Sequence, residues 1–149
     1  MKKLFLLLAI AGLMMQATAQ KLMTKDVPAA VASAFNTAHP TVTDVEWRQT
    51  GANYEAEYDA NKTDVYVTYD ASGTLINTAV KISGSDIPAN AMGYVKANYK
   101  EDEIRDASKI TDVNGKVTYS GKVKGERLFF DSNGNFIRAE KKELPKSGK

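Results

Sequence analysis

The feature that most constrains this chain is an internal repeat. The segment Asp26–Ala29 (DVPA) returns as Asp86–Ala89 (DIPA), sixty residues later. The segment Tyr69–Gly73 (YDASG) returns as Phe130–Gly134 (FDSNG), sixty-one residues later. Two matches at nearly the same spacing indicate a duplicated supersecondary unit. We therefore expect two copies of one structural unit rather than one irregular domain.

Each copy opens with a predicted helix. Pro28 and Pro88 suit a first helical turn, where a missing N–H costs nothing. Gly93 predicts a weaker second helix, by about 1 kcal/mol. The apolar stripes that follow a 3.6-residue period are Val27, Val31, Ala34, Phe35 and Ala38 in the first copy, and Ile87, Ala91, Tyr94 and Val95 in the second.

Alternating apolar and polar residues predict a meander of strands after each helix. The segments 45–47 and 104–107 are predicted to add an edge strand to each copy, and Trp47, which shares strand parity with Val45, is assigned to the core. The fold class is therefore α+β, with two tandem helix-plus-antiparallel-meander repeats forming one sheet backed by two helices, one sheet face being open. The predicted strands are 53–59, 63–69 and 74–82 in the first copy, and 116–123, 126–131 and 135–141 in the second.

The first nineteen residues have the layout of a secretory signal peptide. Lys2 and Lys3 precede an apolar run at 4–15, and the small residues Ala17 and Ala19 mark a cleavage site before Gln20. We expect a periplasmic or secreted protein with no membrane span after cleavage. The predicted organisation is a signal peptide at 1–19, a first repeat at 20–84, a second repeat at 85–141 packed with the first as a single domain, and a flexible tail at 142–149.

Composition argues against several classes of function. Without Lys2 and Lys3 the 20 basic residues fall to 18, which balance the 18 acidic residues, so a nucleic-acid partner is not expected. The chain has no cysteine and one histidine, His39, which predicts no metal site, no cofactor and no catalytic residues. The segment 131–135 resembles the start of a calcium loop, but Lys142 stands where the bidentate glutamate is needed. A hairpin turn is therefore the preferred interpretation, both here and at the equivalent segment 70–74 of the first copy.

The open sheet face is the predicted binding surface. Strand parity places an acidic set on it in the first copy, and a constant shift of sixty-one residues gives a basic set in the second. Each set has one aromatic side chain, as is typical of interfaces. An ordinary solvated face is the alternative for this surface. A small-ligand or peptide carrier, with a pocket between helices and sheet, is the alternative for the function. The candidate residues are Glu55, Glu57, Tyr66, Thr68, Lys116, Thr118, Arg127 and Phe129.

The repeat resembles the beta-lactamase-inhibitor-like, PepSY-like domain of Bacteroidetes envelope proteins, over roughly residues 24–140. This resemblance implies a periplasmic or secreted protein with a curved sheet backed by helices and no established catalytic activity. Because classical PepSY domains accompany secreted peptidases, it also points, by analogy, to a secreted hydrolase or peptidase as partner. Likeness of fold does not transfer function, so no inhibitor contact residue is carried over. The resemblance rests on residues 27–31, Phe35, Pro40, 45–47, 54–58 and 70–73, and on 87–89, Tyr99, 117–119 and 131–134.

Overall fold

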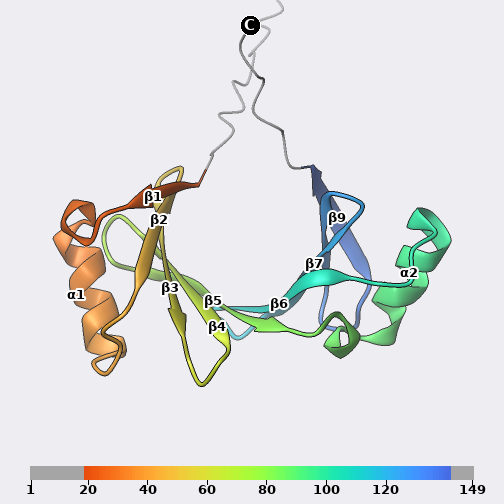
Figure 1. The fold of residues 1–149 in the computed structure, drawn as a ribbon, viewed down its shortest axis with the longest axis horizontal. Helices are drawn as coiled ribbons and strands as arrows, with labels where there is room; N and C mark the ends of the chain where they lie inside the picture. Colours follow the sequence, from red (N-terminus) through yellow and green to blue (C-terminus); the bar gives the residue numbers. More distant parts are fainter. Residues whose placement is uncertain (1–18, 142–149) are drawn as a thin grey trace, which may run out of the picture.

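The computed structural model describes residues 19–141, which form one antiparallel sheet with two helices packed against it (Figure 1). Within this part of the chain nine strands pair in chain order, each with the next. The predicted fold class is confirmed. The strands are β1 (Gln20–Leu22), β2 (Glu46–Thr50), β3 (Asn53–Asp59), β4 (Asp64–Asp70), β5 (Leu75–Ile82), β6 (Arg105–Asp112), β7 (Val117–Val123), β8 (Glu126–Phe130) and β9 (Phe136–Lys141); the helices are α1 (Ala29–Ala38) and α2 (Ala89–Tyr99), which follow the 3-10 turns Thr24–Asp26 and Gly84–Asp86.

The sheet bends into a trough, and the helices lie outside it. In Figure 1 β1 and β2 rise at one end and β9 at the other, while β5 and β6 run along the bottom. On β5, Val80 packs against the core under α1 and Ile82 against the core under α2. Residues two apart on a strand share a face, so both helices cover the same, outer face of the sheet. The inner side, here called the concave face, carries no helix within residues 19–141.

Strand β5 belongs to both repeats. It closes the first repeat by pairing with β4, and its other edge pairs with β6 of the second. Its last residues lead into the second 3-10 turn as β1 leads into the first. Ile82 lies opposite Ala107, and Leu22 lies opposite Trp47, sixty residues earlier on both strands. The sheet therefore consists of two units that overlap in one strand, β5. The unit with α1 is here called the first arm, and the unit with α2 the second arm.

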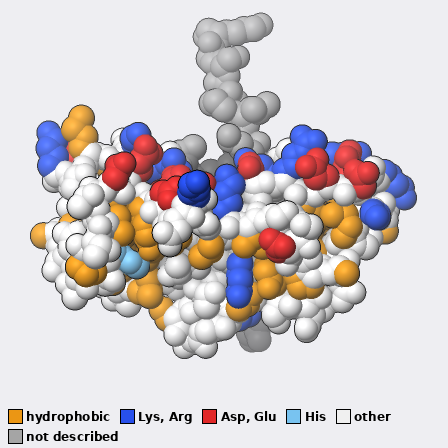
Figure 2. Space-filling model, turned by 60° about the horizontal axis from the view of Figure 1, so that its bottom comes forward, with side chains coloured by type: hydrophobic (Ala, Val, Ile, Leu, Met, Phe, Trp, Pro, Cys, Tyr) orange, Lys and Arg blue, Asp and Glu red, His pale blue; other side chains and the backbone are white. Residues whose placement is uncertain are grey.

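The prediction that residues 45–47 and 104–107 belong to edge strands is wrong. They overlap β2 and β6, which are interior strands, and the edges are β9 and the short β1, which was not predicted. β6 lacks apolar alternation because most of it lies near the middle of the sheet, away from the helices, and only its Ala107, which packs in the core under α2, is buried. Figure 2 turns this underside toward the reader, with apolar side chains visible between the arms and charged ones gathered along one rim.

Both helices begin after their proline rather than containing it. Pro28 and Pro88 are extended cap residues, and their carbonyl oxygens accept the N–H groups of Ala32 and Ala91, each at 3.0 Å. Gly93 lies on the exposed side of α2, where an added Cβ would meet nothing within 4 Å. α2 nevertheless spans 11 residues against 10 in α1. A lower stability of α2 stays a prediction.

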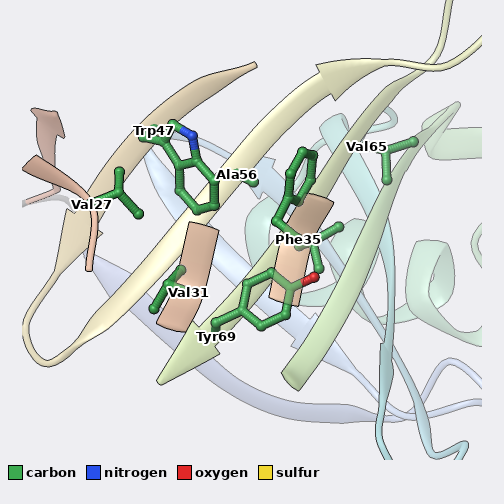
Figure 3. Packing of buried hydrophobic residues seen from close by; sticks show 8 residues of the cluster. Val27, Val31, Phe35, Trp47, Ala56, Val65 and Tyr69 are labelled. Atoms are coloured by element: carbon green, nitrogen blue, oxygen red, sulfur yellow. The ribbon is translucent and has the colours of Figure 1, made fainter. Parts of the chain in front are cut away.

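Each arm has its own hydrophobic core beneath its helix. In the first, shown in Figure 3, Phe35 of α1 meets Trp47 of β2 edge-on, with ring centroids 5.4 Å apart. Trp47, which strand parity assigns to the core, is 2% exposed, and that assignment is confirmed. The first core comprises Val27, Val31, Phe35, Trp47, Ala56, Val65, Val67 and Tyr69; the second comprises Ile87, Ala91, Val95, Ile104, Ala107, Val123, Leu128 and Phe130.

The two predicted hairpin turns are present, and a third has the same construction. Asp70 Oδ1 accepts the backbone N–H groups of Ser72 and Thr74, at 2.8 and 3.0 Å. Asp112 and Asp131 each accept the N–H groups two and four residues ahead, at 2.8 to 2.9 Å. These hydrogen bonds hold the turn closed. Side-chain hydrogen bonds from Ser72 and Asn135, and after them the backbone ones, lower the pKa of Asp70 and Asp131. They use the carboxylate oxygens that a calcium ion would need.

The predicted signal peptide at 1–19, apart from its last residue, and the predicted tail at 142–149 lie outside the described residues. No helix within residues 19–141 is long and apolar enough to cross a membrane.

Candidate protein-binding face

The strand register gathers the predicted residues of the first repeat on the concave face. Glu55 lies opposite Thr68, and Glu57 lies opposite Tyr66, on the neighbouring strands β3 and β4. Ala56, between the two glutamates, is fully buried in the core under α1. Because side chains alternate along a strand, the two glutamates point to the other, concave side, and so do the residues opposite them on β4.

The predicted residues of the second repeat share this face but are more scattered. On β8, Arg127 and Phe129 flank Leu128, which is buried under α2. Thr118 lies on β7, while Lys116 precedes that strand and is exposed in the β6–β7 hairpin. The structure thus brings Arg127 and Phe129 together and leaves Lys116 apart from them.

The constant spacing of sixty-one residues is wrong for β7. The β6–β7 hairpin is longer than β2–β3, so the register relates Glu55 and Glu57 to Ser120 and Lys122, sixty-five residues on. The difference of four residues preserves strand parity, which is why the spacing still selected the correct face. The acidic pair of the first arm therefore corresponds to a hydroxyl and an ammonium group in the second.

In the first arm, an arginine lies between two carboxylates on the concave face. Arg48 Nη2 is 2.9 Å from Glu57 and 3.7 Å from Glu46, and Lys21 Nζ is 3.3 Å from Glu46. Burial, and after it the charge of Glu57, raise the pKa of Tyr66 to about 12. Tyr66 therefore keeps its proton at physiological pH and presents a neutral hydroxyl beside this ion-paired cluster.

Glu55 differs from these neighbours because no cation pairs with it. It is half-buried, and among residues 19–141 it makes no ion pair within 4.0 Å. Burial raises its pKa, Arg48 opposes that shift, Glu57 adds to it, and Arg127 opposes it. Arg127 stands on β8, five strands away along the sheet. The bend of the sheet thus brings the two arms close enough for their charges to interact.

In the second arm, Arg127 is oriented by neutral acceptors. Its Nη1 donates to Ser120 Oγ at 3.2 Å and to the Asp106 carbonyl oxygen at 3.3 Å. Asp106 lies in a bulge of β6 with φ of 45°, a left-handed conformation that costs a non-glycine residue roughly 1 kcal/mol. Its carboxylate binds Lys122 Nζ at 2.6 Å, and this contact lowers the pKa of Asp106.

The side chain of Phe129 is less exposed than its predicted role as an interface anchor requires. Its side chain lies on the concave face but is only 8% exposed. The Arg138 guanidinium covers its ring at 3.8 Å from the centroid, and Arg138 Nη2 is also 3.0 Å from Glu140. The second arm therefore presents a cation on an aromatic ring, whereas the first presents a half-buried Tyr66. The binding role of both residues stays a prediction.

Three residues of the face were missed by the sequence analysis. Arg48 was missed because β2 was not recognised as an interior strand, although its parity with Glu46 places both on one face. Arg138 lies on the predicted strand 135–141, where it shares a face with Glu140. Lys122 was missed because the spacing between the repeats was taken as constant. Strand parity could have found all three.

The only histidine lies away from this face. His39 caps the C-terminus of α1, its ring centroid is 4.8 Å from that of Phe35, and its Nδ1 lies 3.3 Å from Tyr58 Oη. Among the described residues no group of three or more His, Cys, Asp or Glu side chains could hold a metal ion.

Two clefts open at equivalent ends of the arms, between the helix–strand loop and a hairpin turn. They measure about 520 and 450 Å³, and neither lies between a helix and the sheet, where a carrier pocket was considered. The space under α1 is filled by side chains such as Phe35 and Val31, which are fully buried. The linings are 38–44 with 58–61, and Glu101, Glu103, Arg105 and Asp106 with 122–125.

Comparison with protein families finds the same duplication. A family model described as "Putative beta-lactamase-inhibitor-like, PepSY-like" matches the chain twice, over residues 13–77 and 76–138. The junction between the two matches falls within β5, the strand that the repeats share. The chain matches no curated protein.

Several solved structures from Bacteroides species have a similar fold. A Bacteroides eggerthii protein described as "putative periplasmic" has a TM-score of 0.62 and 16% identity, covering 76% of this chain and 88% of its own. A DUF2874 family protein from Bacteroides uniformis gives 0.61 and 19%, with the same coverage. A BLIP-like protein from Bacteroides fragilis gives 0.55 and 17%, covering 80% and 89%. Identities this low show a shared fold and no more.

Proposed function

Because the chain belongs to the beta-lactamase-inhibitor-like, PepSY-like family, we propose that it is an exported, non-catalytic module that binds another protein through its concave face. In this proposal a signal peptide at 1–19 is removed, and the mature chain starts at Gln20, the first residue of β1. The partner is an envelope or secreted protein, such as a hydrolase or peptidase. The inhibitor-like description of the family supports a mechanism in which the face covers a functional surface of that partner.

The observation that carries the proposal is a helix-free sheet face whose charged side chains are already held in place. Arg48 is fixed between two carboxylates, Arg127 by two hydrogen bonds, and Arg138 by a ring and Glu140. Side chains that are ordered before binding lose less conformational entropy when a partner arrives. Arginine and tyrosine are also the side chains most enriched at the energetic centres of protein interfaces.

The experiment that tests the proposal is affinity capture from a periplasmic extract of the source organism, with residues 20–149 as bait. Captured proteins are identified by mass spectrometry, and binding is then measured with the purified partner. Tyr66→Ala probes the concave face, because Tyr66 is only half-buried. Asn36→Ala, on the exposed side of α1, is the matched control.

We expect one partner to bind the wild type and Asn36→Ala equally and to bind Tyr66→Ala at least tenfold more weakly. Circular dichroism verifies that both variants fold. A partner that binds all three proteins with one affinity would exclude the concave face. Phe129→Ala is unsuitable here, because removing a ring that is 8% exposed costs about 3 kcal/mol and risks unfolding.

A further inference from the structure

Glu55 and Arg127 are half-buried charges on interior strands of the concave face, and neither has an ionic partner in the described part of the chain. Within residues 19–141 neither Glu55 nor Arg127 has an oppositely charged group within 4.0 Å. The hydrogen bonds of Arg127 both use Nη1 and end on neutral oxygens, so its Nε and Nη2 groups have no acceptor in the described part of the chain. Lys116 and Asp59, which are exposed near hairpin turns, also make no ion pair among these residues. The paired charges of this face are Lys21 and Arg48 with Glu46, Arg48 with Glu57, Lys81 with Asp64, Lys122 with Asp106, and Arg138 with Glu140.

The two half-buried charges have opposite signs and stand on opposite arms. Glu55 is on β3 in the first arm, and Arg127 is on β8 in the second. Their strand neighbours Ala56 and Leu128 are buried under the helices, so both charged side chains point to the concave face. Each of the two has mixed neighbours. Glu55 has Glu57 on the same strand and Arg48 opposite it on β2, and Arg127 lies between Lys122 on β7 and Glu140 on β9. A ligand in the trough therefore meets a carboxylate on one side and a guanidinium on the other.

The backbone of the trough is already used. The interior strands β3, β4, β7 and β8 pair along both edges, so their N–H and C=O groups cannot bind an added strand. Recognition on this face must come from side chains. A half-buried charge without a partner is costly, and an incoming opposite charge removes part of that cost.

We propose that the concave face receives a loop of another protein that presents a cationic side chain to Glu55 and an anionic side chain to Arg127. This inference rests on the proposed function and specifies the chemistry of its partner. The charge pattern of the two arms selects against a loop of one sign, because one of its ends would meet a like charge.

The test uses four backbone-cyclised hairpin peptides labelled with fluorescein. They are identical except at two tip positions, which are Lys/Glu, Lys/Lys, Glu/Glu or Gln/Gln. Fluorescence anisotropy measures their binding to residues 20–149 at low ionic strength. We expect Lys/Glu to bind tightest, by about tenfold over Gln/Gln, which is the effect of one or two partly buried charge pairs.

Charge reversal changes the preferred peptide in a defined way. Glu55→Lys makes both sides of the trough basic, so Glu/Glu becomes the tightest peptide. Arg127→Glu makes both sides acidic, so Lys/Lys becomes the tightest. The double reversal restores the preference for Lys/Glu, because a hairpin can enter either way round. Asp102→Lys and Lys96→Glu, exposed positions in the α2–β6 loop and on α2, change net charge equally and are expected to leave the ranking unchanged.

Equal or absent binding of the four peptides overturns the inference, as does a ranking that the two control variants alter in the same way. These failures are distinguishable from failure of the proposed function. If capture of the natural partner is lost in Tyr66→Ala but kept in Glu55→Lys and Arg127→Glu, the face is the interface and the charge pattern is not its basis. If capture survives all three changes, the proposed function itself is wrong.

Discussion

The two arms share one pattern of burial but fill their cores with different side chains. In the first, α1 and β2 contribute two large rings, Phe35 and Trp47. The equivalent residues of the second, sixty positions on, are Val95 and Ala107. At this contact between the helix and the second strand of the arm, the side chains of the second core therefore fill a much smaller volume.

The second arm recovers apolar volume elsewhere. Ile104, which precedes β6, is 3% exposed and packs over Gly121. Leu128 stands where the first arm has Val67. Tyr94 of α2 stacks on Phe136 of β9 with ring centroids 4.3 Å apart and nearly parallel planes. The apolar period of a repeat thus determines which side faces the helix, whereas the distribution of volume within that side can change, provided that the total is kept.

Replacing Trp47 by alanine tests this asymmetry most strongly. Because its ring is 2% exposed, Trp47→Ala is expected to cost about 3 to 5 kcal/mol of unfolding free energy. Ala107→Gly, the matched change in the second arm, removes one methyl group and costs about 1 kcal/mol. Urea denaturation of residues 20–149 measures both. Similar losses would show that the arms depend equally on this position.

Glycines in the hairpin turns test whether close contact between a turn and the helix stabilises the fold. Gly73 and Gly115 both have positive φ, at 83° and 79°. An added Cβ at Gly73 would come 2.5 Å from the Ala30 carbonyl oxygen of α1, whereas at Gly115 it would meet nothing within 4 Å. Gly115→Ala therefore costs only the left-handed strain, about 1 kcal/mol.

Gly73→Ala must also push its turn away from the helix, and the total is expected to be about 2 to 3 kcal/mol. Gly134→Ala in the second arm is the equivalent change, since Pro88 O lies 2.8 Å from the added Cβ. Thermal melts of the three variants give the comparison. Equal shifts for Gly115→Ala and Gly73→Ala would disprove the role of the helix contact.

Gly121 tests the smaller core of the second arm. An added Cβ there would overlap Ile104, so Gly121→Ala is expected to cost about 1 to 2 kcal/mol. The double variant Gly121→Ala, Ile104→Ala removes the overlapping Cγ2 of Ile104 and is expected to be less destabilised than the sum of the single changes. A double-mutant cycle by urea denaturation measures that coupling. Strict additivity would mean that these two residues do not compete for one space.

Glu55 gives the smallest expected effect, and one that depends on pH. Its folded-state pKa is raised above 4.5, mainly by burial, so its ionised form disfavours folding at neutral pH. Glu55→Gln is therefore expected to stabilise the protein at pH 7, by less than about 1 kcal/mol because the site is partly solvated. The gain disappears below the unfolded-state pKa, where the carboxyl is protonated in both states. Thermal melts at pH 7 and below pH 4.5 measure it, with the exposed Glu103→Gln as control; a gain that persists in acid would contradict it.

Much of this fold could be predicted where one side of a strand is buried. Tyr54, Ala56 and Tyr58 alternate with glutamates on β3, and that alternation assigns both faces. β6 could not be found in this way, because only its Ala107 is buried and the rest of the strand has no consistently buried side. The cover that Arg138 places over Phe129 depends on which strands are neighbours, which local sequence does not encode.

The doubled use of β5 has a consequence for how the protein melts. The two hydrophobic cores are separate, and alone they would permit two independent transitions. Each arm, however, has β5 as one of its paired strands, so unfolding either arm leaves a row of unpaired backbone groups on the other. We therefore expect a single calorimetric transition in which the arms lose their structure together. Cutting the chain between the repeats would not release two small domains, because only one fragment could keep the common strand.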